Sequence, residues 1–339
     1  GLTTPDPVML HRALAELAEA GFDHVAIEAS SHGLDQYRLD GVRFAAAALT
    51  NVTRDHLDYH ADADAYRRAK LRLLAELLPP GRPAILNADA DSFSAAEATC
   101  RTACRPVWAV GAHGGAIQLT ERRATADGQD LELCWGGREH SVHLPLIGGF
   151  QASNALVAAA LVAAAGGEPQ AIVRALSGLR GAPGRLERVG QRPNGAAVYV
   201  DYAHTPDALE TVLHAVRPHT QARLSLVFGC GGDRDRGKRP QMGAVAARLA
   251  DRVIVTDDNP RGEDPADIRG AILAACPGAR EIGDRAAAIA AAIAALAPGD
   301  LLVIAGKGHE SGQIIGDRTL PFDDRVVAHE ALTRLEGQP

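Results

Sequence analysis

The sequence predicts an α/β protein of two domains, in which strands and helices alternate along the chain. Its 339 residues are enough for two hydrophobic cores. In the second half, four short apolar runs are separated by helical patterns, and this order is typical of a parallel sheet covered by helices on both faces. The pattern restarts around residues 182–185, where Pro and Gly interrupt it. We therefore predict domains over residues 1–182 and 183–339.

The first domain begins with a helical pattern over residues 8–20, which Gly21 ends. Residues 24–28 are largely apolar and predict a buried strand, and residues 30–33 predict a loop. The next expected elements are a strand within residues 44–51, a helix over 62–78 that Pro79 ends, and a strand over 84–87.

Residues 107–146 predict a β-rich segment of hairpin-like structure, with turns at Gly114-Gly115 and Gly136-Gly137. An alanine-rich helix is expected over residues 151–165. In the second domain the predicted strands are 197–201, 224–228, 253–255 and 301–304, and the predicted helices are 206–216, 240–250, 265–275 and 284–296.

Composition makes several classes of protein improbable. The net charge is −7 and no long basic run occurs, so we expect no nucleic-acid binding, which needs a positive surface. The apolar stretches are too short to span a membrane, and no signal-peptide pattern is recognised. The five cysteines include one pair at helical spacing, Cys100 and Cys104, which is too few for a zinc site. Reduced thiols and a cytoplasmic location are expected.

The strongest functional signal follows the apolar run at residues 252–256, where the chain reads Asp257-Asp258-Asn259-Pro260-Arg261. In open α/β sheets, ligands bind beyond the carboxyl ends of the strands. The planar guanidinium of Arg261 can bind a carboxylate through two parallel hydrogen bonds. The simpler alternative is a turn with a solvated arginine.

Three further polar loops follow predicted strands, at residues 201–206, 229–239 and 306–310. The glycines of the second loop let backbone amides approach an anion at a helix start. That loop is neither a Walker A sequence nor a dinucleotide-binding fingerprint. A nicotinamide-dependent dehydrogenase would need a Gly-x-Gly-x-x-Gly turn after a predicted strand, and none is found. Four polar loops at one sheet edge together indicate a site for a charged small molecule.

The first domain offers three weaker candidates. Glu28 ends the first predicted strand, where it is either part of a site or an ordinary capping or surface residue. His56 stands between two aspartates and near His60, so it is either a ligand of a divalent ion or a structural histidine. Lys70 lies in a predicted helix as either a surface lysine with a buried stem or a partly buried, neutral amine available for chemistry.

Together these motifs resemble the Mur ligase family, and within it the members that add the third residue of the peptidoglycan stem peptide. The resemblance covers almost the whole chain. It is carried by residues 3–6, 28–34, 50–60, 69–70, 201–209, 229–239, 258–261 and 306–310. It implies a central ligase domain, with a mostly parallel sheet and a β-rich segment, followed by a Rossmann-like C-terminal domain.

The chemistry implied by the resemblance is ATP-dependent amide bond formation with Mg²⁺. The side-chain carboxylate of UDP-N-acetylmuramoyl-L-alanyl-D-glutamate would take the γ-phosphoryl group of ATP, and the amine of meso-2,6-diaminopimelate would then displace phosphate from the acyl phosphate. Matching positions imply that Glu28, His56 and Lys70, the last as a carbamate, hold the metal, with Lys70 and His56 as catalytic residues.

The resemblance also implies binding roles. The positions that match the UDP-muramoyl dipeptide site are Thr3, Thr4, Ser30, Gln36 and Arg38. The positions that match the nucleotide site are Asn154, Arg185, Asp201 and His204. The positions that match the diaminopimelate site are Arg234, Asp258, Asn259, Pro260, Arg261, Gly306 and Glu310. Arg261 would pair with the distal carboxylate of diaminopimelate and Glu310 with its distal ammonium, which predicts a preference for diaminopimelate over lysine.

The sequence departs from the family pattern near its start. The Gly-Lys-Thr phosphate loop and the N-terminal uridine-binding domain are not found, and Leu2 stands where asparagine is common. We therefore expect a ligase fragment with negligible activity on its own and a central sheet that lacks one strand. The alternatives are a non-catalytic module that binds diaminopimelate or a nucleotide, a lysine-adding ligase, and a folylpolyglutamate synthase.

Overall fold

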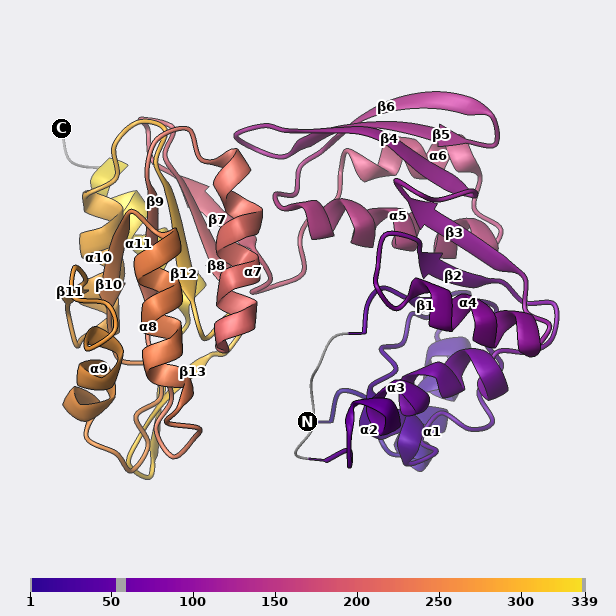
Figure 1. The fold of residues 1–339 in the computed structure, drawn as a ribbon, viewed down its shortest axis with the longest axis horizontal. Helices are drawn as coiled ribbons and strands as arrows, with labels where there is room; N and C mark the ends of the chain where they lie inside the picture. The colour runs from indigo at the N-terminus through magenta and orange to yellow at the C-terminus, as the bar shows by residue number, and fades with distance from the viewer. Residues whose placement is uncertain (1, 53–58, 337–339) are drawn as a thin grey trace. The chain divides into compact units, whose positions relative to one another are not determined.

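The computed structural model describes residues 2–52 and 59–336 of the chain, which divides into two compact units (Figure 1). Unit 1 comprises residues 1–123, 130–144 and 150–178, and unit 2 comprises residues 124–129, 145–149 and 179–339. The predicted α/β class is confirmed, since each unit contains a six-stranded sheet and helices.

The first sheet has the strand order β1-β2-β3-β4-β5-β6. Its strands are β1 (Ala47–Leu49), β2 (Ala84–Asn87), β3 (Val107–Gly111), β4 (Ile117–Ala124), β5 (Gln129–Trp135) and β6 (Arg138–Leu144). The helices of unit 1 are α1 (Pro7–Glu19), α2 (Ser31–Asp35), α3 (Ala63–Arg72) with the π-helical turn Leu73–Leu77, α4 (Phe93–Thr102), α5 (Gly149–Ala164) and α6 (Pro169–Leu176).

The helix predictions of unit 1 are confirmed by their capping residues. Asp6 accepts a hydrogen bond from Met9 N at the start of α1, and Pro7 occupies the first helical turn, where its missing N–H is not needed. Asp62 caps α3 in the same way through Ala65 N. Buried leucines of α1 and of the turn after α3 pack with β1 and β2 in one core cluster.

Three predictions for unit 1 are wrong. Residues 24–28 are not a buried strand: Val25 is 45% exposed, and among the described residues no backbone–backbone hydrogen bond involves residues 23–29. Their apolar character indicates a hydrophobic neighbour, but a strand also requires a paired backbone. Residues 30–33 open α2, with Ser30 as its N-cap. Gly114-Gly115 does not form a hairpin, because β3 and β4 pair in parallel.

The second sheet has the strand order β11-β10-β9-β12-β8-β7. Its strands are β7 (Glu187–Gln191), β8 (Ala197–Asp201), β9 (Leu224–Phe228), β10 (Arg252–Val255), β11 (Arg280–Glu281) and β12 (Leu301–Ala305). All neighbouring pairs are parallel except β7 with β8, which is antiparallel. The parallel sheet predicted for this half of the chain is confirmed.

The helices of unit 2 cover this sheet in two groups (Figure 1). One group contains α7 (Pro206–Val216), α8 (Lys238–Leu249) and α9 (Pro265–Leu273), and the other contains α10 (Arg285–Ala294) and α11 (Asp324–Glu336). On the side of α10 and α11, Val198 and Val200 of β8 pack with Leu302 and Ile304 of β12. The intervening residues of both strands are also buried, so the sheet is apolar on both faces, as expected for a parallel sheet.

Several elements of unit 2 were not predicted from the sequence. They are β7, β11, α11 and the antiparallel hairpin of β13 (Gly312–Ile315) and β14 (Arg318–Pro321). Within the described parts of the chain, no helix combines the length and apolarity needed to cross a membrane.

Candidate functional site

The four polar loops of unit 2 lie at one edge of its sheet, as predicted, because β8, β9, β10 and β12 are parallel. The loops pack closely on one another. A Cβ atom on Gly229 would lie 2.2 Å from Thr256 O, and one on Gly306 would lie 2.8 Å from Asp258 Oδ2. Gly306 also has a φ of +117°, which side chains disfavour. The loops after β9, β10 and β12 therefore form one continuous surface.

A buried polar network lies at the centre of this edge. The amine Nζ of Lys307 donates to Asn259 Oδ1 at 2.9 Å and to Glu310 Oε2 at 3.1 Å. Asn259 Nδ2 also donates to Glu310 Oε2, at 3.0 Å. Asn259 and Lys307 are 4% and 0% exposed, whereas the Glu310 side chain is 36% exposed. The network therefore reaches the surface through the Glu310 carboxylate.

Arg261 is held by the β13–β14 hairpin. Its N–H donates to Ile314 O at 3.1 Å, and its carbonyl accepts from Gly316 N at 2.7 Å. Its backbone has a φ of +51°, a conformation uncommon for residues other than glycine and frequent at functional sites. The guanidinium Nη1 donates to Gly232 O at 2.9 Å, so the half-buried side chain lies against the glycine-rich loop.

The other diaminopimelate-site candidates border the same surface. Asp258 and Pro260 are buried, and the carbonyl of Asp258 accepts from Gln313 Nε2 at 2.8 Å. Arg234 is exposed, and its Nη1 lies 3.3 Å from Asp233 O. The structure thus brings together all seven residues predicted for this site.

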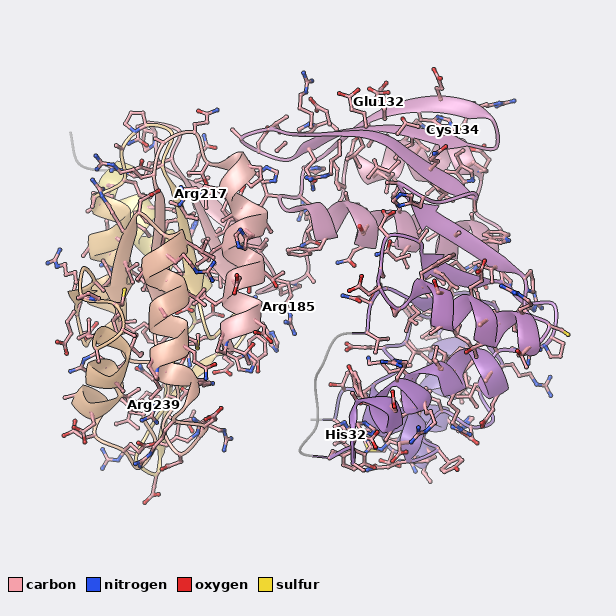
Figure 2. The ribbon with its side chains drawn as sticks, viewed as in Figure 1. His32, Glu132, Cys134, Arg185, Arg217 and Arg239 are labelled. Carbon is pink, nitrogen blue, oxygen red and sulfur yellow. The ribbon has the colours of Figure 1, made fainter. Side chains whose placement is uncertain are left out.

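The nucleotide-site candidates of unit 2 form a second cluster. The guanidinium of Arg185, which is labelled in Figure 2, lies over the Tyr202 ring at 4.7 Å from its centroid. The His204 ring lies 4.6 Å from that of Tyr202. Asp201 is buried, and its two carboxylate oxygens accept from Leu186 N and Ala203 N at 2.8 and 2.7 Å. Burial raises the pKa of this carboxyl group, and the two amides oppose the effect. Asp201 therefore holds the loop in place.

Asn154 is not part of that cluster within unit 2. It lies in α5 of unit 1, where its side chain is exposed.

Four candidates for the UDP-muramoyl dipeptide site are joined by hydrogen bonds in unit 1. Thr4 is completely buried. Its hydroxyl lies 3.0 Å from Ser30 Oγ and its carbonyl accepts from Arg38 Nη1 at 2.8 Å. Arg38 Nη2 also donates to Gln36 Oε1. Because Thr4 is buried, it supports its neighbours, and Ser30, Gln36 and Arg38 provide the accessible polar groups.

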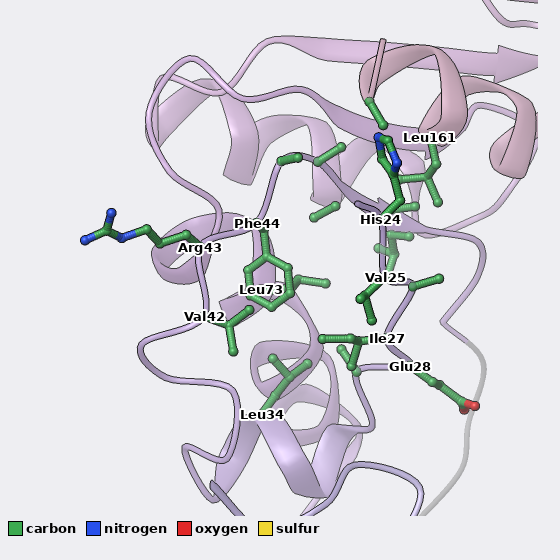
Figure 3. Close-up of a pocket in the computed structure, with 18 of the residues that line it drawn as sticks. His24, Val25, Ile27, Glu28, Leu34, Val42, Arg43, Phe44, Leu73 and Leu161 are labelled. Carbon is green, nitrogen blue, oxygen red and sulfur yellow. The ribbon is translucent and has the colours of Figure 1, made fainter. Parts of the chain in front are cut away.

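A cavity of about 1190 Å³ lies beside this cluster. Thr3, Glu28, Ser30 and Lys70 contribute to its lining, and most of the other lining residues are apolar. The close-up in Figure 3 shows apolar side chains of the 24–28 and 42–44 segments around it, while the Glu28 carboxylate points away from them.

Of the three residues expected to hold magnesium, the structure describes Glu28 and Lys70. Mg²⁺ prefers oxygen ligands, and Glu28 supplies a carboxylate beside the cavity that Lys70 also lines. An ammonium repels a cation, so Lys70 fits a metal only as a carbamate. His56 lies outside the described residues. No group of three His, Cys, Asp or Glu side chains within those residues is arranged to hold an ion.

Three residues at these sites were not named as site residues from the sequence, although two of them lie in the predicted polar loops. Lys307, Gln313 and Tyr202 each contact predicted site residues. A signal existed for Lys307, because it follows a buried strand after a single glycine. It is also one of only three lysines among the 35 basic residues of the chain, with Lys70 and Lys238.

Comparison with known proteins agrees with the fold and the loops. Residues 1–162 match the model of the Mur ligase middle domain, and residues 184–308 match the Mur ligase, glutamate ligase domain. The chain belongs to the Mur ligase family.

Two similar curated proteins are both named UDP-N-acetylmuramoyl-L-alanyl-D-glutamate–2,6-diaminopimelate ligase. The protein of Caulobacter vibrioides is 57% identical over 337 residues, which cover 99% of this chain and 69% of the relative. The protein of Brucella melitensis is 57% identical over 338 residues, with the same shares of the two chains.

Comparison with solved structures also relates this chain to such ligases. A structure of a ligase of that name has 35% identity and a TM-score of 0.74, and the match covers 98% of this chain and 69% of the other. A Mycobacterium tuberculosis folylpolyglutamate synthase has 23% identity and a TM-score of 0.71, with 98% and 72% covered. The second match shows a shared fold.

Proposed function

We propose that this chain acts in the ATP-dependent ligation of meso-2,6-diaminopimelate to UDP-N-acetylmuramoyl-L-alanyl-D-glutamate during peptidoglycan synthesis. The identity of 57% over 99% of the chain to relatives named for this reaction supports the proposal. The observation that carries it in the structure is that Arg261, Asn259 and Glu310 lie at one sheet edge, which places a guanidinium and a partly exposed carboxylate on the same surface.

The proposed amino-acid site matches the chemistry of diaminopimelate. Each end of this ligand carries an ammonium and a carboxylate, so its distal end presents both charges. Arg261 would bind the distal carboxylate, because a guanidinium can donate two parallel hydrogen bonds to it. Glu310 would accept from the distal ammonium. Lysine has the ammonium alone and would leave the guanidinium without that partner.

The proposed acceptor site lies in unit 1. Ser30, Gln36 and Arg38 would bind the UDP-muramoyl dipeptide, with Thr3 at the cavity and Thr4 behind them. Arg38 suits this role because its guanidinium is already fixed by two acceptors, which lowers the entropy lost when an anionic ligand binds.

The proposed nucleotide site of unit 2 uses Arg185 and His204, with Asp201 as their support. Asn154, a residue of α5 in unit 1, keeps the nucleotide-binding role that the family resemblance implies. In the proposed reaction, a D-glutamate carboxylate oxygen attacks the γ-phosphorus of ATP and ADP leaves. The diaminopimelate nitrogen then attacks the acyl carbon, and phosphate leaves as the amide forms. Magnesium, when bound, stabilises the negative charge on the transferred phosphoryl group. Glu28 and carbamylated Lys70 would hold it, together with His56.

We also place this activity in the cytoplasm. The described cysteines are free thiols, which fits a reducing compartment, and ATP is the proposed energy source.

The amino-acid site can be tested by isothermal titration calorimetry of this chain with meso-diaminopimelate and with L-lysine. We expect diaminopimelate to bind at least about tenfold more tightly, because one well-made charge-assisted interaction is worth about 1.5–3 kcal/mol. Arg261→Ala should remove most of that difference. Arg280→Ala, which replaces an exposed arginine of β11, serves as the control. Equal affinity for both amino acids would contradict the proposal.

A further inference from the structure

Lys307 is a buried cation with two defined partners. It follows Gly306 at the end of β12, its side chain is completely buried, and its Nζ lies 2.9 Å from Asn259 Oδ1 and 3.1 Å from Glu310 Oε2. An ammonium removed from water requires such partners, because an unpaired buried charge is unfavourable.

The first consequence concerns the Asn259 side chain. Its Oδ1 accepts from Lys307 Nζ and from Ile314 N at 3.0 Å. Both partners are donors, so the amide oxygen must face them and Nδ2 must face Glu310. Without the ammonium, the Asn259 amide oxygen would keep only the Ile314 amide as a donor.

The second consequence concerns the Glu310 carboxylate. Oε2 accepts from both Lys307 Nζ and Asn259 Nδ2. Oε1 has no hydrogen-bond partner among the described residues, and the side chain is 36% exposed. One oxygen is therefore fixed in the protein while the other is available to a ligand.

We propose that Lys307 is a positioning residue for the distal ammonium of diaminopimelate. It fixes Asn259 and one oxygen of Glu310, so that the remaining oxygen, Oε1, is presented to that ammonium in a single geometry. Lys307 itself does not touch the ligand. This role rests on the proposed function, because it takes diaminopimelate as the ligand.

The test compares two ligands that differ at the distal amine. We would titrate the unmodified chain and its Lys307→Met variant with meso-diaminopimelate and with 2-aminopimelate, which lacks that amine. In the unmodified chain, diaminopimelate should bind about tenfold more tightly. In Lys307→Met the affinity for diaminopimelate should fall about tenfold and that for 2-aminopimelate less than about twofold, because only the ammonium contact depends on Glu310.

Two further variants separate positioning from folding. In a Glu310→Gln background, Lys307→Met should have little additional effect on diaminopimelate affinity, since coupled residues are not additive. If Lys307→Met does not fold, Lys307→Gln takes its place in the same titrations. The glutamine side chain retains a hydrogen-bond donor toward Asn259.

Three outcomes would overturn the role. An equal loss of affinity for both ligands would reduce Lys307 to a structural residue, and unchanged affinities would exclude any effect on the site. If the unmodified chain bound neither ligand, the proposed function would fail and this role with it, so the two failures are distinguishable.

Discussion

Arg285 and Asp324 form an ion pair in which neither side chain is exposed to solvent. Arg285 Nε and Nη2 donate to the two carboxylate oxygens, each at 2.7 Å, and Nη2 also donates to Ala305 O at 2.9 Å. The pair joins the first residue of α10 to the first residue of α11 and fixes the carbonyl before Gly306. It therefore supports the sheet edge at which the proposed amino-acid site lies.

The first prediction concerns the stability of this pair. Arg285→Met should lower the free energy of unfolding of unit 2 by about 3–5 kcal/mol, because it leaves a buried carboxylate without compensation. The double variant Arg285→Met/Asp324→Leu should recover part of that loss. Urea denaturation measures both values. A double variant less stable than the single one would show that the carboxylate is not the cause.

The second prediction concerns Gly33 in α2. A Cβ atom there would lie 2.7 Å from the Thr4 side chain, so Gly33→Ala should displace Thr4 and lower the stability of unit 1 by about 1–3 kcal/mol. Gly270→Ala is the control, since Gly270 lies within α9 and a Cβ atom there would have open space around it. That substitution should be neutral or stabilise the helix by up to about 1 kcal/mol. Thermal unfolding of the two variants distinguishes these effects.

The third prediction concerns how the stability contributed by Glu263 changes at acidic pH. Glu263 accepts from Arg239, through both carboxylate oxygens, and from Asp233 N. These bonds lower the pKa of Glu263 from 4.5 to about 2. A depressed pKa means that the stabilisation is complete above about pH 4.5 and is lost as the pH falls toward 2.

Glu263→Gln tests this linkage. The variant should be less stable than the unmodified chain at pH 7, and the difference should shrink on acidification toward pH 3. The denaturation midpoints of the variant and of the unmodified chain, measured at both pH values, give the two stability differences. A difference that stayed constant with pH would rule out the carboxylate as the titrating group.

The fourth prediction concerns Lys70. If it carries the proposed carbamate, ¹³C NMR of the chain in ¹³C-bicarbonate should show a bound carbonyl resonance. Lys70→Arg should abolish that signal, because a guanidinium does not form a carbamate under these conditions. The three lysines of the chain make the assignment direct, and Lys238→Arg is the matched control. Retention of the signal in Lys70→Arg would place the modification elsewhere.

Much of unit 2 could be predicted because local patterns and tertiary structure agree there. The predicted strands at 197–201 and 224–228 coincide with β8 and β9, and the predicted helix at 206–216 coincides with α7. Parallel pairing then brings polar loops to one edge, so Asn259, Arg261 and Glu310 could be grouped before the structure was known.

The features that could not be predicted depend on pairing between distant segments. Residues 24–28 are apolar because they line a cavity, and composition alone does not distinguish that role from a strand. Lys307 contacts Asn259, 48 positions away, and no local pattern indicates such a contact. The β13–β14 hairpin did carry a local signal, because Gly316, with a φ of +57°, provides the turn between two short strands.

The most direct test of the central claim is a crystal structure of this chain with meso-diaminopimelate bound. The account predicts that the Arg261 guanidinium lies within about 2.7–3.2 Å of the distal carboxylate and that Glu310 Oε1 contacts the distal ammonium. An Arg261 side chain facing bulk water, with the amino acid bound elsewhere, would contradict it.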